Sequence, residues 1–309
     1  MLFHFVERKW WYFLISGLVI VPGTVFLLLG GLKPGIEFRG GTLIDAQFTS
    51  APANEEVREI FAGLGHSAIV HRAEGERVQI RTPQLDTDQT VAAENALKAK
   101  YGSAYVGSTP QSVSPSFSVE ILRNALWSVA LASLLIVLLI AFAFRSFGWA
   151  AFRYGIAAIL AVLHDALLVL GVFAILGYFY DVEVDSLFVT AVLTVIGFSV
   201  HDTIVVFDRI RENLRLNPGE PLNPVINFSI MQTMVRSLIT GVTVVFTLLA
   251  LYSFGGYSIR NFALALLIGI ISGAYSSVFN AAQIISLWQE IEDRLRGRAR
   301  PQLKGSTPA

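Results

Sequence analysis

The chain has 309 residues, of which 54% are apolar and only 15% are charged, and its net charge is +0. A soluble domain usually carries about 25% charged residues. Here long apolar runs alternate with short charged ones, which is typical of a polytopic membrane protein. The charge balance indicates no nucleic-acid partner. The absence of Cys excludes thiol chemistry and Cys-based metal sites. No HExxH, GxSxG or Walker A motif is present, so we predict neither an enzyme nor an ATPase.

Six apolar runs are long enough to cross a membrane. A helix rises 1.5 Å per residue, so about 20 residues cover a hydrocarbon core of about 30 Å. The first run follows basic residues but has no clear small-x-small cleavage site, so we expect a retained anchor rather than a cleaved signal. The predicted spans are 10–31, 121–144, 153–177, 186–207, 234–254 and 261–286.

Lys and Arg in the short connections set the expected orientation of these spans. They gather at the N-terminus, after the second span, after the fourth span and in the C-terminal tail. The connection "YFYDVEVDSL" (178–187) instead has three acidic residues and no basic one. We therefore predict a multi-pass protein of the cytoplasmic (inner) membrane, with both termini cytoplasmic and residues 35–117 outside.

Residues 35–117 form the one sizeable polar region, and their pattern predicts alternating strands and helices. The helix over 54–65 is expected to begin at the cap Asn54, and the helix over 86–102 near Asp86 or Thr87. The strands are expected at 41–49, 67–73, 76–82 and 104–113. The order β-α-β-β-α-β predicts an α+β ferredoxin-like domain. Its exposed strand edges, at 42–49 and 103–113, could accept an extended client chain by β-addition.

The expected organisation has four parts: residues 1–34 (cytoplasmic N-terminus and first helix), 35–117 (outer domain), 118–288 (helices two to six) and 289–309 (basic cytoplasmic tail). "DRIRENLRLN" (208–217) is expected to continue the fourth helix until Pro218, Pro221 and Pro224 break it. "PVINFSIMQTMV" (224–235) then reads as an amphipathic segment leading into the fifth span. The tail is expected to be disordered, with basic residues that can lie on anionic membrane lipids.

Three ionisable residues within the spans are candidate functional residues. Asp165 is near the middle of the third span, Asp202 near the end of the fourth, and Arg236 near the start of the fifth. A charge at a helix centre costs about 2.5–3.5 kcal/mol on insertion scales, so such residues usually face a bundle interior or a watery path. Asp202 and Arg236 are expected at similar depth, because the fourth span runs inward and the fifth outward.

An Asp202–Arg236 pair would lower the desolvation cost of both residues. Arg stays protonated, so Asp202 is the member that could bind a proton and break the pair, which would couple proton flow to helix movement. The alternative is a static pair that only fixes helix packing. For Asp165 the alternative is equally open, since Ser and Thr from other helices could satisfy its carboxylate.

The residues around these candidates carry weaker signals. His164 and His201 could titrate near neutral pH. Adjacent helical residues point about 100° apart, so neither His is expected to contact its neighbouring Asp. Ser199 and Thr203 are further possible modulators. Close helix approach is expected at small residues, namely Gly197, Ser199, Gly241, Gly269 and Gly273.

Two motifs resemble the SecD/SecF family of protein-export membrane proteins. "GIEFRGGTLID" (35–45) is similar to its Gly-Ile-Asp-Phe-x-Gly-Gly signature, and "VIGFSVHDTIVVFDRIRENL" (195–214) is similar to the fourth-span signature of its SecF branch. The six-span layout also matches, so the resemblance covers essentially the whole chain. Glu37, Arg39 and His201 depart from the family pattern. The signature positions are Gly35, Glu37, Phe38, Gly40, Gly41, Asp208 and Arg209; from the residues alone, Asp208 and Arg209 read as a solvated helix face.

The resemblance implies a subunit that assists Sec-dependent export of preproteins with the proton motive force. It implies SecD as a separate partner that supplies a second six-span half, with the SecYEG channel, the SecA motor and YajC as further partners. It also implies proton coupling through Asp202, Arg236 and Asp165, with protons in place of any cofactor and no metal. Two alternatives stay open. The chain could be a non-conducting scaffold for the translocon, or half of a proton-driven efflux transporter with an apolar cavity in its outer domain.

Overall fold

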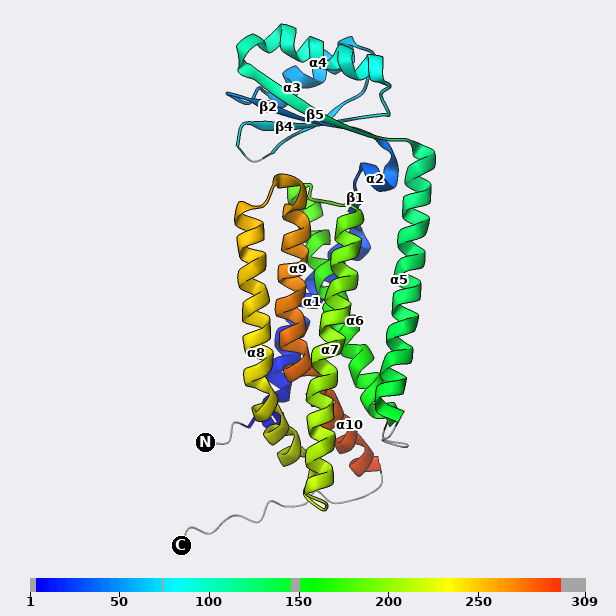
Figure 1. The fold of residues 1–309 in the computed structure, drawn as a ribbon, viewed down its shortest axis with the longest axis vertical. Coiled ribbons are helices and arrows are strands. Elements are labelled where there is room, and N and C mark those ends of the chain that lie inside the picture. Colours follow the sequence, from blue (N-terminus) through cyan, green and yellow to red (C-terminus); the bar gives the residue numbers. More distant parts are fainter. Residues whose placement is uncertain (1–3, 74, 146–150, 296–309) are drawn as a thin grey trace. The chain divides into compact units, whose positions relative to one another are not determined.

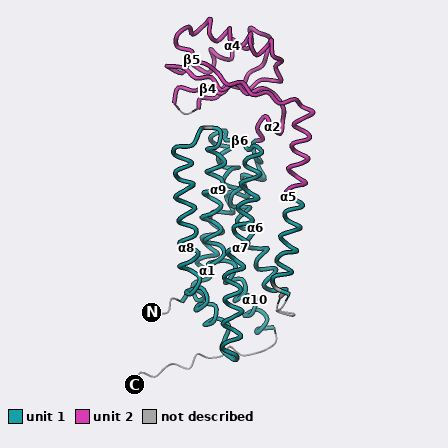
Figure 2. Tube along the Cα trace, in the orientation of Figure 1, with its two compact units in different colours: residues 1–33, 129–309 teal, residues 34–128 magenta. Residues whose placement is uncertain are grey.

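The structure is a computed structural model that describes residues 4–73, 75–145 and 151–295. It divides into two compact units, one made of residues 1–33 and 129–309 and the other of residues 34–128 (Figure 2). Six helical segments among the described residues are long and apolar enough to cross a membrane, which confirms the predicted number of spans. The basic tail beyond residue 295, and its expected disorder and lipid contacts, lie outside the described residues.

After the first span, the helices are longer than the hydropathy pattern indicates, whereas the first helix ends at Leu29, two residues before the predicted end (Figure 1). A short 3₁₀ turn, η1 (Val6–Arg8), precedes the first of them, and the last is interrupted by a π turn, η4 (Ser277–Ala281). In chain order the helices are α1 (Lys9–Leu29), α5 (Pro115–Phe144), α6 (Ala151–Tyr180), α7 (Ser186–Leu216), α8 (Leu222–Phe254), α9 (Tyr257–Ser276) and α10 (Ala282–Leu295).

The connection between α7 and α8 is shorter than predicted. α7 continues to Leu216, as expected for residues 208–217, and α8 already begins at Leu222 after the N-cap Pro221. Pro224 therefore lies in the first turn of α8 and does not break a helix. A proline is tolerated there because the first backbone N–H groups of a helix have no intrahelical acceptor.

The fourth and sixth spans form the centre of the helix bundle, because 50% and 56% of their most apolar 18-residue segments are buried. α9 approaches α7 through Gly269, where an added Cβ would collide with Val195, and through Gly273, where it would lie 3.4 Å from Ser199. These two glycines therefore permit the close approach that was predicted. Gly197 has no atom within 4 Å of an added Cβ, so the prediction for Gly197 is wrong.

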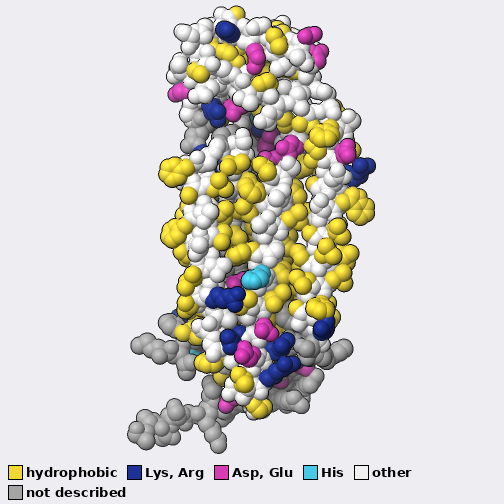
Figure 3. All heavy atoms as spheres, in the orientation of Figure 1, with side chains coloured by type: hydrophobic (Ala, Val, Ile, Leu, Met, Phe, Trp, Pro, Cys, Tyr) yellow, Lys and Arg dark blue, Asp and Glu magenta, His cyan; other side chains and the backbone are white. Residues whose placement is uncertain are grey.

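The outer surface of the bundle is apolar, as a lipid-facing surface requires. Large hydrophobic side chains on α1, α5 and α8 are exposed, for example Leu18, Leu126 and Phe246 at 73%, 64% and 67%. Figure 3 shows hydrophobic side chains spread over the helices on one face, with charged side chains gathered near the lower end of the bundle. This distribution fits the membrane-spanning role of these helices.

The second unit contains a four-stranded antiparallel sheet and two helices that lie on the same side of it (Figure 1). The sheet order is β3-β4-β2-β5, and Ile44 of β2 pairs with Ile80 of β4. The elements follow the predicted β-α-β-β-α-β order. They are β2 (Gly41–Phe48), α3 (Asn54–Gly63), β3 (Ile69–Arg72), β4 (Arg77–Thr82), α4 (Thr87–Tyr101), the 3₁₀ turn η2 (Gly102–Ala104) and β5 (Tyr105–Val113).

Two details of this unit differ from the sequence predictions. The N-cap of α3 is Ala53, which makes no side-chain cap bond, so Asn54 is not the cap. β2 lies between β4 and β5, so residues 42–49 have no free edge, and the prediction that a client could pair there is wrong. The edge strands of this sheet are β3 and β5. α4 is capped by Asp86 as predicted, through a capping box with Gln89.

Two short elements between α1 and β2 were not predicted. The strand β1 (Lys33–Pro34) pairs with β6 (Glu183–Val184) in a separate two-stranded sheet. The short helix α2 (Ile36–Arg39) then occupies the first half of the glycine-rich signature.

Candidate functional site

Asp165 is the most completely buried carboxylate among the candidate residues, with an exposed fraction of 0%. Its Oδ2 accepts hydrogen bonds from the hydroxyls of Ser199 at 2.5 Å and Ser276 at 2.6 Å. Its Oδ1 accepts one from Ser272 at 2.6 Å and lies 3.0 Å from His164 Nδ1. Serines from α7 and α9 therefore surround the carboxylate. This is the arrangement in which hydroxyl groups from other helices satisfy Asp165, one of the two possibilities that the sequence left open.

Asp202 lies on α7 and is 9% exposed. Its Oδ1 accepts a hydrogen bond from Ser237 of α8 at 2.7 Å, and its Oδ2 accepts one from Ser277 of the π turn at 2.6 Å. Both oxygens are thus held by hydroxyl groups. A hydroxyl can donate or accept, so these partners suit either protonation state of the carboxyl group.

The sixth span joins the two carboxylates through consecutive residues. Ser276, the last residue of α9, donates to Asp165, and Ser277, the first residue of the π turn, donates to Asp202. Adjacent helical positions point about 100° apart, so one short segment can reach α6 and α7 at once. π turns occur frequently at functional sites.

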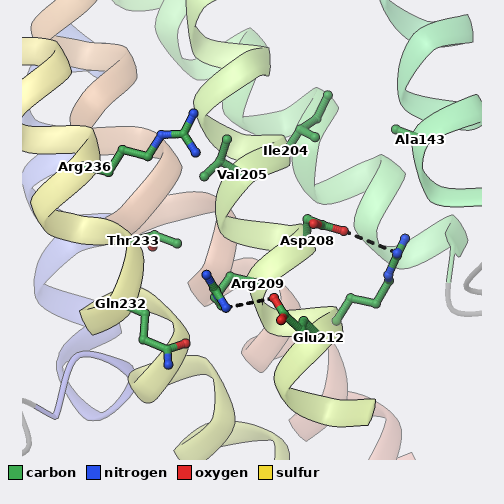
Figure 4. Close-up of a pocket in the computed structure, with 10 residues that line it drawn as sticks. Ala143, Ile204, Val205, Asp208, Arg209, Glu212, Gln232, Thr233 and Arg236 are labelled. Carbon is green, nitrogen blue, oxygen red and sulfur yellow. Dashed lines mark hydrogen bonds and ion pairs between the residues drawn. The ribbon is translucent and has the colours of Figure 1, made fainter. Parts of the chain in front are cut away.

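The predicted pair between Asp202 and Arg236 is not formed in this structure. Arg236 is exposed and makes no ion pair or hydrogen bond with any residue that the structure describes. It lines a pocket of about 280 Å³ and points from α8 toward α7 near Val205 (Figure 4). Depth along the membrane was insufficient to predict the contact, because Ser237, one position further along α8, is the residue that faces Asp202.

Asp208 and Arg209 line the same pocket, at the end of α7. Each forms an ion pair three residues along the helix, Asp208 with Arg211 at 3.5 Å and Arg209 with Glu212 at 2.8 Å (Figure 4). The Asp208 side chain is 61% exposed. These signature residues therefore lie on a solvated helix face, as the residues alone indicated.

His164 contacts its neighbour Asp165, which contradicts the prediction from helical geometry. The 100° between adjacent positions separates the Cβ directions, but the imidazole is long enough for Nδ1 to turn back to the carboxylate. Its other nitrogen, Nε2, lies 2.9 Å from Ser16 Oγ of α1. His201 is exposed, and no hydrogen bond between described residues joins it to Asp202. Thr203 is buried, and its hydroxyl finds no partner among the described residues.

The glycines of the first signature have a structural role in the turn between α2 and β2. Gly40 and Gly41 have φ values of +77° and +120°, which residues with a side chain rarely adopt. A Cβ on Gly41 would lie 2.7 Å from the carbonyl oxygen of Thr82, and one on Gly40 would lie 3.1 Å from Pro115 Cα. Glycine is therefore required twice in succession. Gly35, Glu37 and Phe38 belong to the same segment, as the N-cap and first turn of α2.

Of the serines that hold the carboxylates, Ser199 was predicted as a possible modulator. The others, Ser237, Ser272, Ser276 and Ser277, were not predicted, although the sequence carries a signal for part of the set. Ser272, Ser276 and Asn280 recur every four residues in an otherwise apolar span, which places them on one face. A polar stripe of this kind indicates a polar partner on another helix. No group of three His, Asp or Glu residues that could hold a metal ion occurs in the described part of the chain.

Fold and site together define a multi-pass membrane protein with two carboxylates buried at the centre of its helix bundle. Two family models match it. Residues 93–291 match the model for the C-terminal part of the protein export membrane proteins SecD/SecF, and residues 25–52 match the SecD/SecF GG motif. The chain belongs to the SecD/SecF family.

Individual relatives agree with this assignment. The protein translocase subunit SecF of Thermobaculum terrenum is 47% identical, over 94% of this chain and 95% of that protein. The protein translocase subunit SecDF of Bacillus subtilis is 36% identical, over 92% of this chain but 38% of the longer protein. The crystal structure of SecDF, a translocon-associated membrane protein from Thermus thermophilus, superposes with a TM-score of 0.82 at 29% identity, covering 94% of this chain and 39% of that one.

Proposed function

We propose that the chain is a SecF-type subunit that assists Sec-dependent protein export across the cytoplasmic membrane and uses the proton motive force. The family membership and the 47% identity to a SecF protein support the role in export. The candidate site supports the use of protons. Moving one charge through the membrane potential supplies about 2.3 kcal/mol per 100 mV.

The observation that carries the proton-coupled role is the environment of the two carboxylates. Asp165 and Asp202 are buried within spans, and their partners are serine hydroxyls and one imidazole. No Lys or Arg among the described residues pairs with either one. An ionised carboxylate that is buried without a cation is costly, whereas a protonated one is neutral and can donate to a hydroxyl. Such a group is suited to bind and release a proton.

Arg236 belongs to the second state of the switch in this proposal. Arg236 and Ser237 are neighbours on α8 and point about 100° apart. A rotation of α8 by that angle would replace Ser237 with Arg236 at Asp202. Hydroxyl partners can serve the protonated form of Asp202, whereas a guanidinium, which only donates, favours the ionised form. Alternation between the two would couple proton release to movement of α8 against α7.

SecD is the proposed partner, as a separate chain that supplies the second half of the assembly. The SecDF relative from Bacillus subtilis, of which this chain covers 38%, supports this arrangement. The SecYEG channel, SecA, YajC and the translocating preprotein are the further proposed partners. The proposed orientation places both termini in the cytoplasm and residues 35–117 outside. The strand order β3-β4-β2-β5 supports a ferredoxin-like class for the outer domain.

The test is gradient-dependent translocation in vesicles that contain SecYEG, SecA, SecD and this chain. A preprotein is first engaged with ATP, ATP is then removed, and completion of translocation is measured with and without a proton gradient. Asp202→Asn and Asp165→Asn keep the size of the side chain but cannot ionise. We expect each to abolish the gradient-dependent part and to leave the ATP-driven part unchanged, at matched levels of the complex.

Asp208→Asn is the matched control, because Asp208 lies on the same helix as Asp202 but is exposed and ion-paired. It is expected to retain the gradient-dependent part. If Asp202→Asn and Asp165→Asn also retain it, proton coupling through this site is refuted and a non-conducting scaffold becomes the better reading. Gradient-driven release of small molecules without the channel would favour the efflux alternative instead.

A further inference from the structure

A chain of hydrogen bonds runs from Asp165 to the first membrane helix. His164 Nδ1 lies 3.0 Å from Asp165 Oδ1, and His164 Nε2 lies 2.9 Å from Ser16 Oγ on α1. Asn280 of the π turn donates from its Nδ2 to Ser16 Oγ at 2.9 Å. Ser16 and Asn280 are 8% and 3% exposed. The chain thus joins α6, α1 and the sixth span through groups that are almost closed to the surroundings.

The direction of this chain follows from the state of Asp165. An ionised carboxylate only accepts hydrogen bonds, so His164 must carry its proton on Nδ1. The neutral imidazole then accepts at Nε2, which makes the Ser16 hydroxyl the donor. The Ser16 oxygen in turn accepts from the Asn280 amide. Every donor has an acceptor when the chain runs from Asn280 through Ser16 and His164 to Asp165.

The addition of one proton reverses the same chain. The His164 Nδ1 proton moves to Asp165 Oδ1, and the Ser16 hydroxyl proton moves to His164 Nε2. The added proton binds to Ser16 Oγ and points to Asn280 Oδ1, which lies 3.3 Å away. One N–H and one O–H bond break, one N–H and two O–H bonds form, and no electrons are transferred. The Asn280 amide offers both its nitrogen and its oxygen to Ser16, so the structure accommodates either direction.

We propose that Asp165 and His164 bind the proton as one unit, and that Ser16 holds α1 to this unit differently in its two states. In the sequence, α1 is followed by the short strand β1 and then by α2 and β2 of the outer domain. α1 is therefore the element through which a change at Asp165 is passed toward the outer domain. The inference rests on the proposed proton-coupled function and identifies the helix that responds to it.

A second contact keeps α1 and α6 together when the polar chain changes. Gly23 lies seven residues after Ser16, and Gly171 lies seven residues after His164. Gly23 and Gly171 meet backbone to backbone. Seven residues are close to two helical turns, so the same faces of both helices meet at two levels. Loss of the Ser16 hydroxyl therefore removes one contact and leaves the helix pair assembled.

Few other titratable groups face the unit. Tyr275 of α9 stacks on the His164 ring at 6.4 Å, and its hydroxyl donates to the backbone oxygen of Tyr12 on α1. From α7 the facing residue is Ser199. Asp202 connects to Asp165 through the adjacent serines of the sixth span. No Lys or Arg among the described residues pairs with His164 or Asp165. The titration of this unit is therefore measured in the Asp202→Asn variant, so that a protonated Asp202 does not contribute to the signal.

The experiment uses the full chain in complex with SecD in lipid nanodiscs. Infrared difference spectra record the C=O stretch of protonated carboxyl groups against pH, and Asp165→Asn identifies the Asp165 band. Ser16→Ala is expected to move the midpoint of this band to lower pH by less than about one unit, because each state loses one hydrogen bond and only the difference between the two bonds counts. In Ser16→Ala, the protonated unit loses the acceptor of its Nε2–H group, and the unprotonated unit loses the hydroxyl that donates to Nε2. An imidazole N–H is a stronger donor than a serine hydroxyl, so the protonated unit loses the stronger bond and binds its proton less tightly. Ser16→Thr keeps the hydroxyl and is expected to keep the midpoint.

A double-variant comparison separates coupling from packing. The Asn side chain of His164→Asn can replace Nδ1 but cannot reach Ser16, so Ser16→Ala should have no further effect in that background. An unchanged midpoint in Ser16→Ala, or an equal shift in both backgrounds, would overturn the inference. Gradient-dependent translocation, measured separately with Asp202→Asn, tests the proposed function. Loss of translocation in Asp202→Asn together with an unchanged midpoint in Ser16→Ala would therefore reject this inference alone.

Discussion

The contact between Gly23 of α1 and Gly171 of α6 predicts a specific sensitivity to a single methyl group. A Cβ on Gly171 would lie 2.7 Å from Gly23 Cα, and a Cβ on Gly23 would lie 2.8 Å from Gly171 Cα. Two carbon atoms in favourable contact are about 3.5–4.0 Å apart. Gly171→Ala therefore forces the two helices apart by about 1 Å. Both sides of the contact are backbone, so no side-chain rotation can relieve it.

The size of the effect follows from a comparison with Gly197→Ala. Overpacking of this kind costs about 1–3 kcal/mol. Alanine also gains up to about 1 kcal/mol of helix propensity over glycine. Nothing lies within 4 Å of a Cβ on Gly197, so Gly197→Ala has the propensity gain alone. The difference between the two variants isolates the packing penalty, and we expect Gly171→Ala to be less stable by about 1–3 kcal/mol.

The assay is equilibrium unfolding of the full chain in mixed micelles, with wild type, Gly171→Ala, Gly23→Ala and Gly197→Ala measured side by side. The double variant of Gly23 and Gly171 should lose less than the sum of the single losses, because the first methyl already opens the gap that the second needs. Equal stabilities of Gly171→Ala and Gly197→Ala would refute the close helix contact. Additive losses would show that the two glycines do not share one contact.

Three further predictions concern the outer domain and can be read from hydrogen exchange on the full chain. Burial raises the pKa of Asp45, with Arg77 acting against it, so the folded state binds this proton more tightly than the unfolded state. The contribution of Asp45 to stability is then present at low pH and lost as the pH rises. Asp45→Asn should therefore slow exchange in β2 at pH 7 but not at a pH below 3.8, the ordinary pKa of an Asp side chain. Equal effects of Asp45→Asn at the two pH values would contradict this. Gly41→Ala should destabilise the sheet by more than 1 kcal/mol, since φ is +120° and Thr82 blocks the Cβ; unchanged exchange in β2 and β4 would argue against it. Asp86→Ala should cost about 1 kcal/mol and expose the first turn of α4, whereas uniform protection along α4 would exclude a capping role.

Hydropathy and alternation predicted much of the fold because they depend on local physics. The spans follow from the length of apolar runs, and each was found. The strands of the outer domain follow from period-two alternation, which places Ile44, Ala46 and Phe48 on the buried face of β2. Asp86 was predicted as a cap because its side chain bonds backbone only three residues away. The position of β2 inside the sheet depends on long-range pairing, which alternation does not contain.

The candidate site was predicted at the level of residues but not of contacts. Depth in the membrane placed Asp202 and Arg236 at one level, yet it says nothing of rotation about the helix axis. One residue along a helix changes the direction by about 100°, and Ser237 rather than Arg236 faces Asp202. For His164, helical geometry led to the wrong prediction of no contact with Asp165. The flexible side chain of His164 turns back and reaches the Asp165 carboxylate.

The sixth span contacts both carboxylates through two consecutive residues. Ser276 and Ser277 are consecutive, so their hydroxyls cannot move independently along the helix axis. A movement of this segment would change both hydrogen bonds, at 2.6 Å to Asp165 and 2.6 Å to Asp202, at the same time. A proton bound at either carboxylate therefore changes the partner requirements of the same segment. The π turn that begins at Ser277 interrupts the regular ladder of the sixth helix at the residue that contacts Asp202.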